Sequence, residues 1–167
     1  MTALQNLIDK FEFEEDDDAR AEIITSEFEF LQDHRKWDFL LPLIETTDTY
    51  DLIKVGIYKM IEIADFRPED LPTLKDRILA ALLHETDDDV RKYAYASLTW
   101  AFSAFDDVLA LCLKTVENKR EDMDVRHWAF GVIEKSKNTA VVNTFRERLL
   151  AVSEFKTSAG RLYANRT

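Results

Sequence analysis

The sequence predicts an all-α protein assembled from repeated helix pairs. The 167-residue chain has only three glycines and three prolines, too few for the many tight turns that a sheet protein needs. Hydrophobic residues make up 46% and charged residues 33%, which is typical of a folded domain and not of a disordered chain. A short motif also recurs about every 35 residues, which is typical of a repeat architecture.

The recurring motif is Asp-Val-Arg followed by an aromatic residue and an alanine. Asp89–Ala94 recurs as Asp124–Ala129, and a weaker copy, Arg161–Ala164, follows near the end of the chain. Upstream, Asp51–Gly56 and the short echo Asp18–Arg20 continue the series at spacings of 38 and 33 residues. The spacing predicts one domain of four to five units, at residues 1–33, 34–66, 67–103, 104–137 and 138–167.

Each unit is predicted to contain two helices. Apolar residues at i, i+4 in Leu71–His84 indicate one helix face, and polar breaks such as Glu85–Asp88 contain the residues that cap helices. Thr46–Asp48 and Glu117–Met123 are similar breaks in the neighbouring units. In chain order, we expect helices over residues 2–12, 17–32, 36–45, 50–64, 71–84, 89–103, 106–116, 124–135, 139–153 and 157–165.

These units resemble HEAT repeats in the length of their helix pairs, in Asp-Val-Arg at the start of a second helix, and in the proline of Leu40–Ile44. The resemblance covers about residues 35–165 and implies a right-handed α-solenoid of four to five HEAT-like helix pairs. Ile53 departs from it, because it stands where an arginine is expected. The resemblance also implies a bend at Pro42, core valines, and a polar ladder between units, made by Val90, Val125, Asp89, Arg91, Asp124 and Arg126.

Second helices usually line the concave surface of such a solenoid, where partners bind. Residues three, seven and ten positions after each motif aspartate share one helix face, so we expect them to line this groove. Tyr58 and Ile61 are the least expected on a solvated face and are candidate contacts, unless terminal helices cover them. The predicted groove residues are Lys54, Tyr58, Ile61, Lys92, Ala96, Thr99, His127, Gly131 and Glu134.

Two further sets of positions are predicted to pack between units. Gly56, Ala94 and Ala129 share one helix position, where small side chains allow two helix backbones to approach closely. Aromatic residues flank that position, and an aromatic stripe at helical spacing is more often core than a binding surface. The flanking aromatic residues are Tyr93, Tyr95, Trp100, Trp128 and Phe130.

The formal net charge of −11 disfavours a nucleic-acid or anionic-membrane partner. The charge is uneven, because residues 9–33 have a net charge of −9 whereas residues 135–167 have a net charge of +5. The acidic end is therefore expected to attract a basic protein, although such runs also occur simply as solvated surface. The candidate contact residues at this end are Asp16, Asp17, Asp18 and Glu22.

No motif of an enzyme or a cofactor site is present. The three glycines are isolated, the three histidines lie far apart, and Cys112 sits in an apolar helix where a buried thiol is the ordinary interpretation. Asp16–Asp18 and Asp87–Asp89 are better explained by helix capping than by calcium binding. We therefore expect no catalysis, no cofactor and no metal, and the single cysteine and the lack of a signal-like start predict a cytoplasmic location.

The sequence favours a non-catalytic protein-binding module. Its size, acidity and predicted architecture also resemble those of bacterial immunity proteins, which implies an antitoxin that neutralises a basic toxin by direct binding. Two alternatives stay open. One is a HEAT-like enzyme or ligand-binding solenoid, similar to bilin lyases or alkylpurine-DNA glycosylases, and the other is a structural adaptor in a larger assembly.

Overall fold

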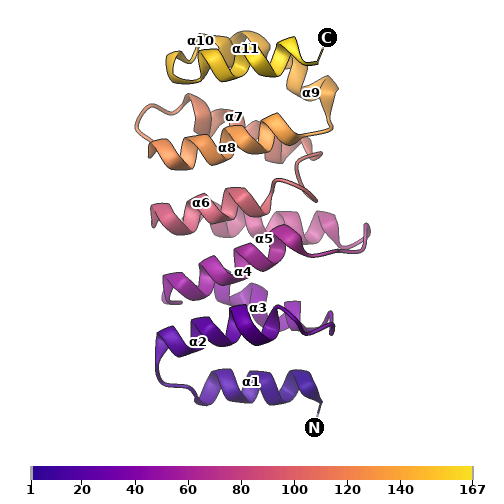
Figure 1. Cartoon of the computed structure of the whole chain (residues 1–167), viewed down its shortest axis with the longest axis vertical. Helices are drawn as coiled ribbons and strands as arrows, with labels where there is room; N and C mark the ends of the chain where they lie inside the picture. Colours follow the sequence, from indigo (N-terminus) through magenta and orange to yellow (C-terminus); the bar gives the residue numbers. More distant parts are fainter. Residues whose placement is uncertain (1, 167) are drawn as a thin grey trace.

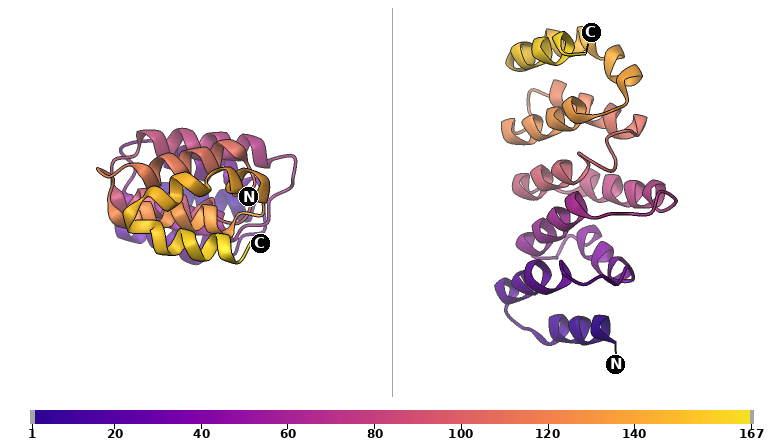
Figure 2. Two further views of the ribbon diagram at one scale, coloured as in Figure 1. Left: turned by 90° about the horizontal axis from the view of Figure 1, so that it is seen from above. Right: turned by 45° about the vertical axis from the view of Figure 1, so that its right-hand side comes forward.

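The computed structural model describes residues 2–166, and these residues form helices and turns with no β-strand. The all-α prediction is confirmed. The helices follow one another along a single column from α1 at one end to α11 at the other (Figures 1 and 2). The elements are α1 (Ala3–Phe13), α2 (Asp17–Ile23), the π-helical η1 (Ile24–Phe28), α3 (Lys36–Glu45), α4 (Asp51–Ile63), α5 (Leu71–His84), α6 (Asp88–Ser97), α7 (Asp106–Glu117), α8 (Met123–Lys135), α9 (Thr139–Thr144), α10 (Arg146–Ala151), the 3-10 helical η2 (Ser153–Phe155) and α11 (Lys156–Ala164).

The helices form two layers along the column. α2, α4, α6 and α8 contact one another in series and face the viewer in Figure 1, whereas α3, α5 and α7 lie behind them. α3 also contacts α5, and α7 contacts α8. One helix pair has an apolar side that it cannot bury alone, so each pair depends on the pairs above and below it.

Most predicted helix boundaries lie within two residues of the observed ones, and three predicted segments differ. The segment 17–32 leaves α-helical geometry at Ile24 and ends at Phe28. The segment 89–103 ends at Ser97, because the Leu98 and Thr99 amides donate to carbonyls only three residues back, in the manner of a turn. The segment 139–153 is interrupted at Phe145.

The core positions of the second helices reveal a one-residue difference in register. Val90 and Val125 are fully buried, as predicted. In α4 the equivalent position is taken by Ile53, which is 3% exposed, and not by Leu52, which is 50% exposed. The alignment on Asp51 was therefore wrong by one residue. The corrected alignment places Lys54, and not Ile53, at the position of Arg91 and Arg126.

Gly56 lies where α4 passes close to the first unit. A Cβ atom added to Gly56 would lie 3.0 Å from Cγ2 of Thr25 and 3.2 Å from Cγ2 of Ile24. At Gly131, in contrast, an added Cβ atom would meet nothing within 4 Å. Gly56 is therefore tightly packed, as predicted, but the position that it was predicted to share with Ala94 and Ala129 belongs to Ile57 in the corrected register.

We expect Gly56→Leu and Gly131→Ala to change stability in opposite directions. Overpacking should make Gly56→Leu destabilising by about 1–3 kcal/mol. Gly131→Ala should stabilise the protein by about 0.5–1 kcal/mol, because alanine favours the helix and has free space there. Urea unfolding followed by circular dichroism measures both changes, and a Gly56→Leu variant as stable as the parent protein would contradict the close approach.

Candidate functional site

The loops between the paired helices lie along one edge of the column, at the left in Figure 1, where α2, α4, α6 and α8 begin. We call this side the loop edge. It carries exposed carboxylates from four consecutive loops and helix starts. These are Asp16, Asp17, Asp18, Asp48, Asp51, Asp88, Asp89, Asp122 and Asp124. The predicted residues Asp16, Asp17 and Asp18 are thus exposed, as is Glu22 near the end of α2.

Helix capping explains why the acidic residues gather at this edge. The Asp16 carboxylate accepts a hydrogen bond from the Ala19 amide at 2.8 Å, and the Asp87 carboxylate accepts one from the Val90 amide at 2.9 Å. Asp122 accepts from two amides at the start of α8. Acidic side chains also interact favourably with the positive end of the helix dipole. Local folding therefore places a row of carboxylates on the surface.

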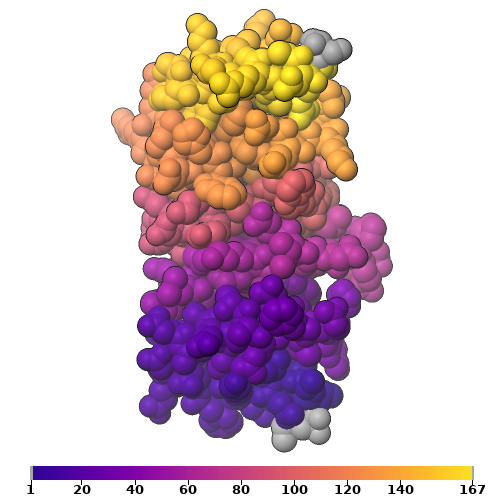
Figure 3. Space-filling view, viewed as in Figure 1, coloured from indigo at the N-terminus to yellow at the C-terminus, as the bar shows by residue number. Residues whose placement is uncertain are grey.

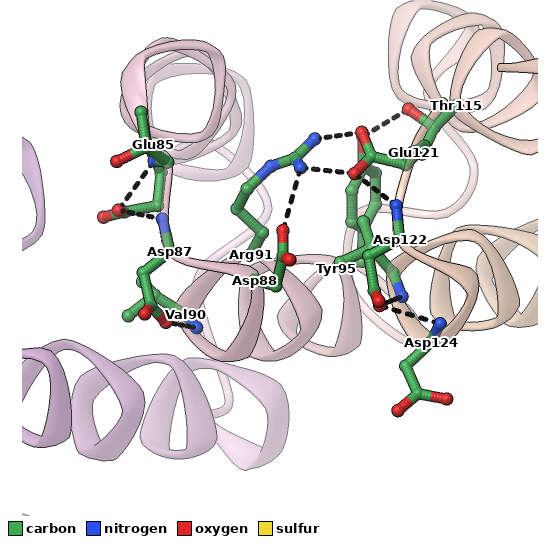
Figure 4. Close-up of polar contacts among 12 residues, drawn as sticks. Glu85, Asp87, Asp88, Val90, Arg91, Tyr95, Thr115, Glu121, Asp122 and Asp124 are labelled. Atoms are coloured by element: carbon green, nitrogen blue, oxygen red, sulfur yellow. Dashed lines mark hydrogen bonds and ion pairs between the residues drawn. The ribbon is translucent and has the colours of Figure 1, made fainter. Parts of the chain in front are cut away.

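Beneath the exposed acids, basic residues of the second helices reach into the next loop of the column. The Nζ atom of Lys54 lies 2.8 Å from Oε2 of Glu85, and Nη1 of Arg126 lies 2.9 Å from Oε1 of Glu154. Arg91 pairs in the same way with Glu121, as Figure 4 shows. We call these contacts the cross-unit ion pairs.

The cross-unit ion pairs correct the polar ladder that the HEAT resemblance implied. Arg91 and Arg126 do bridge neighbouring units, but their partners are glutamates, Glu121 in the loop before α8 and Glu154 in η2. Asp89 instead pairs with Lys92 of its own helix at 2.6 Å, and Asp124 belongs to none of these pairs. Arg126 also donates to the Val116 carbonyl at 3.0 and 2.9 Å, so its guanidinium ties α8 to the end of α7.

The cross-unit glutamates are held in their charged form. The guanidinium of Arg91 lowers the pKa of Glu121. Burial raises the pKa of Glu85, but hydrogen bonds from Lys54 and from two backbone amides outweigh it, and the net pKa is lowered. Hydrogen bonds from Ser153, from the backbone and from Arg126 lower the pKa of Glu154 to about 2. These glutamates are held in ion pairs within the protein. The exposed aspartates are therefore the acidic groups of the loop edge that a partner can contact.

A recess opens on the loop edge between the starts of α6 and α8. Its volume is about 350 Å³, and Lys92 is the basic side chain in its lining. The neighbouring carboxylates raise the pKa of Lys92, with Asp89 contributing most. A recess of this charge suits an incoming lysine or arginine side chain. It is lined by Thr86, Asp87, Asp88, Asp89, Lys92, Asp122 and Asp124.

Five residues of the predicted groove are buried, among them Ala96 at 1% exposed, so their predicted exposure was wrong. Lys54 is 3% exposed, and both Tyr58 and Ile61 are 1% exposed. The one-residue error in the alignment had assigned these core positions of α4 to the exposed side of the helix. Neighbouring helices of the stack cover them, and burial raises the pKa of Tyr58. Thr99 is 5% exposed in the turn that follows α6. Lys92 is half-buried, whereas His127 and Glu134 are exposed as predicted.

The exposed side of α4, α6 and α8, which we call the second-helix face, carries large apolar side chains. Ile63 is 70% exposed, Trp100 61% and Trp128 39%. The prediction that both tryptophans pack between units was therefore wrong, although Tyr95 and Phe130 are buried. In the corrected register, one position of this face lies ten residues after the core position of each second helix, and it is occupied by Ile63, Trp100 and Lys135. The sequence contained this repeat, but the misaligned α4 concealed it.

Lysine side chains lie over aromatic rings on the second-helix face. Nζ of Lys59 is 4.7 Å from the ring centre of Tyr93, and Nζ of Lys135 is 5.3 Å from the ring centre of Trp100. Figure 3 views the molecule from this side, with the surfaces of successive parts of the chain one above the other. Basic and aromatic side chains of neighbouring helix pairs therefore lie against one another on this face.

Within residues 2–166, no three histidine, cysteine, aspartate or glutamate side chains converge as metal ligands do. None of the helices in that range is both long and apolar enough to cross a bilayer. Cys112 is fully buried in α7, and burial raises the pKa of its thiol. No protein-family model, no curated protein sequence and no solved structure matches this chain.

Proposed function

We propose that this protein is a non-catalytic binding module that takes a basic protein partner on its loop edge. The observation that carries the proposal is the row of exposed carboxylates that four consecutive loops contribute to one side of the column. An antitoxin that neutralises a basic toxin is the form of this function that best suits the size and charge of the chain. Such a protein acts by occupying the toxin surface and needs no reactive group of its own.

We also propose that the column is a right-handed α-solenoid of four to five HEAT-like helix pairs. Two features support this architecture. The chain alternates between two helix layers, and the second helices contact one another in series. Each cross-unit ion pair also joins residues 28 to 31 positions apart, so equivalent side chains perform the same task in successive units. A repeat array exposes one long edge, which suits an extended interface.

The loop edge would act in two steps. At long range, the exposed carboxylates attract a basic protein and raise its rate of encounter. At contact, the recess beside Lys92 accepts a basic side chain, and partial desolvation strengthens its interaction with Asp88, Asp89 and Asp124. The long-range step depends on ionic strength, and the contact step depends on the partner's shape.

The test compares association rates after neutralising the acidic end. Asp16, Asp17 and Asp18 are replaced together by asparagine, which still caps a helix and still accepts the Tyr50 hydroxyl. The partner is first captured from the source organism on the immobilised parent protein and is then purified. At low salt we expect its association rate constant to fall about three- to tenfold for the variant, with a weaker dependence on salt.

The matched control neutralises two exposed acids outside the loop edge, in the connection between α4 and α5. Asp65→Asn with Glu69→Gln removes charge from the other edge of the column and should leave the rate close to that of the parent. An association rate that does not depend on salt in the parent protein would contradict steering. Equal losses in both variants would show that overall charge matters and the loop edge does not.

A further inference from the structure

The second-helix face has the composition of an interface and no covering element. Ile63 and Trp128 project from α4 and α8, and Trp100 projects from the turn that follows α6. The other helix layer lies behind α4, α6 and α8, so no element covers this side of the column. Two exposed tryptophans on one connected face are unusual for a surface that meets only water. Tryptophan is also the residue type most enriched at the energetic centres of interfaces.

The distribution of charge along the column indicates which partner this face can bind. The net charge is −9 over residues 9–33 and +5 over residues 135–167, at opposite ends of the column. Glu15 and Glu22 are exposed at the first end, and Lys156 and Arg161 are exposed on α11 at the other. Among the described residues, none of these four side chains takes part in an ion pair. The protein therefore carries two complementary ends of its own.

Only one two-fold arrangement of two copies brings unlike ends together. A two-fold axis along the column would place α2 against α2 of the second copy, acid against acid. A two-fold axis along α6, the middle second helix, makes the columns antiparallel and places α2 against α11 of the other copy. This rotation reverses the order of the helices along the column but not the direction along each helix. Trp100 therefore faces Trp100 of the second copy near the axis, and α4 faces α8.

The second-helix face is also locally complementary in this arrangement. α4 presents Lys59, Glu62 and Ile63, whereas α8 presents Trp128, Glu134 and Lys135. Glu62 and Lys135 lie at the same end of their helices, so an acid–base pair between them becomes available twice in a symmetric dimer. We propose that this protein associates with a second copy of itself as an antiparallel dimer through the second-helix face. The loop edges stay open at the sides, so the dimer is distinct from the proposed binding of a basic partner.

Sedimentation velocity over a range of concentrations of the full chain tests the dimer. The parent protein should shift from monomer to dimer with rising concentration, and Trp100→Glu should raise the dissociation constant at least about tenfold, since it places two charges near the axis. Leu83→Glu is the matched control, because Leu83 is 67% exposed on α5, in the other layer. This control should dimerise like the parent. A parent protein that stays monomeric, or a Trp100→Glu variant that dimerises like the parent, would overturn the proposal.

Charge reversal tests the antiparallel orientation. Glu15→Lys with Glu22→Lys places lysines at the end that would face Lys156 and Arg161 of the other copy, and Lys156→Glu with Arg161→Glu places glutamates at the end that would face Glu15 and Glu22. Each variant alone should dimerise about tenfold more weakly, and an equimolar mixture should form mixed dimers with near-parent affinity. Mixing that fails to restore association would rule out the antiparallel arrangement. These measurements need no partner protein, so their outcome is separate from that of the proposed function.

Discussion

Replacing Lys54 with methionine is expected to lower the free energy of unfolding by about 3–5 kcal/mol. The Lys54 side chain is 4% exposed and that of its partner Glu85 is 10% exposed. Without the ammonium group, the Glu85 carboxylate stays buried between two units with only backbone amides as partners. Breaking a buried ion pair from one side costs more than the pair itself contributes, because the remaining charge loses both water and partner.

Two further variants make this prediction specific. Lys59→Met removes an exposed lysine of the same helix, whose ammonium group lies over Tyr93, and should cost no more than about 1 kcal/mol. Adding Glu85→Gln to Lys54→Met removes the stranded charge and should recover part of the loss. Chemical denaturation of the parent, the two single variants Lys54→Met and Glu85→Gln, and the double variant measures the coupling between the two side chains. If the free energy of unfolding of Lys54→Met lay within about 1 kcal/mol of that of the parent, the burial of this pair would be contradicted.

The sequence analysis missed the structural role of Lys54 because it aligned α4 one residue out of register. Periodicity located nearly every helix, because the apolar spacing and the capping residues are local signals. The alignment of α4 with α6 relied on Asp51, yet Tyr50 occupies the N-cap position there, and Asp51 is the first helical residue. The pattern of buried side chains identifies Ile53 as the core position, and that pattern depends on contacts with other units. A local motif does not contain this information.

The candidate site was predicted unevenly for a similar reason. The exposure of Asp16, Asp17 and Asp18 follows from local charge density, and the sequence indicated it. The loop edge as a whole required knowing that loops about 35 residues apart lie side by side, which brings Asp88 and Asp124 to one recess. The exposure of Trp100 depends on α6 ending at Ser97. A hydrophobicity pattern also does not show whether a neighbouring helix covers an aromatic side chain or leaves it exposed to solvent.

The second large effect is a loss of stability in acid. Glu85, Glu121 and Glu154 have lowered pKa values in the folded protein, relative to the ordinary value of 4.5. As the pH falls, the unfolded chain therefore takes up these protons before the folded protein does, and the equilibrium shifts toward unfolding. The stabilisation is fully present above about pH 5 and is lost progressively toward the folded pKa values, which for Glu154 is about 2.

Urea unfolding at a series of pH values from 7 to about 2.5 measures this loss, and Glu121→Gln shows where it originates. Glutamine still accepts a hydrogen bond from Arg91 but does not titrate, so the variant should be less stable at neutral pH and lose less stability in acid. Protonation also removes the net charge of −11 and makes the protein positive below its isoelectric point of about 4.7, and this change in self-repulsion is shared by both proteins and largely cancels in the comparison. Parallel pH profiles for parent and variant would mean that the charged Glu121 contributes nothing to the contact between α6 and α8. The same loops cap the second helices and present the exposed aspartates, so losing the cross-unit ion pairs in acid should also loosen the loop edge.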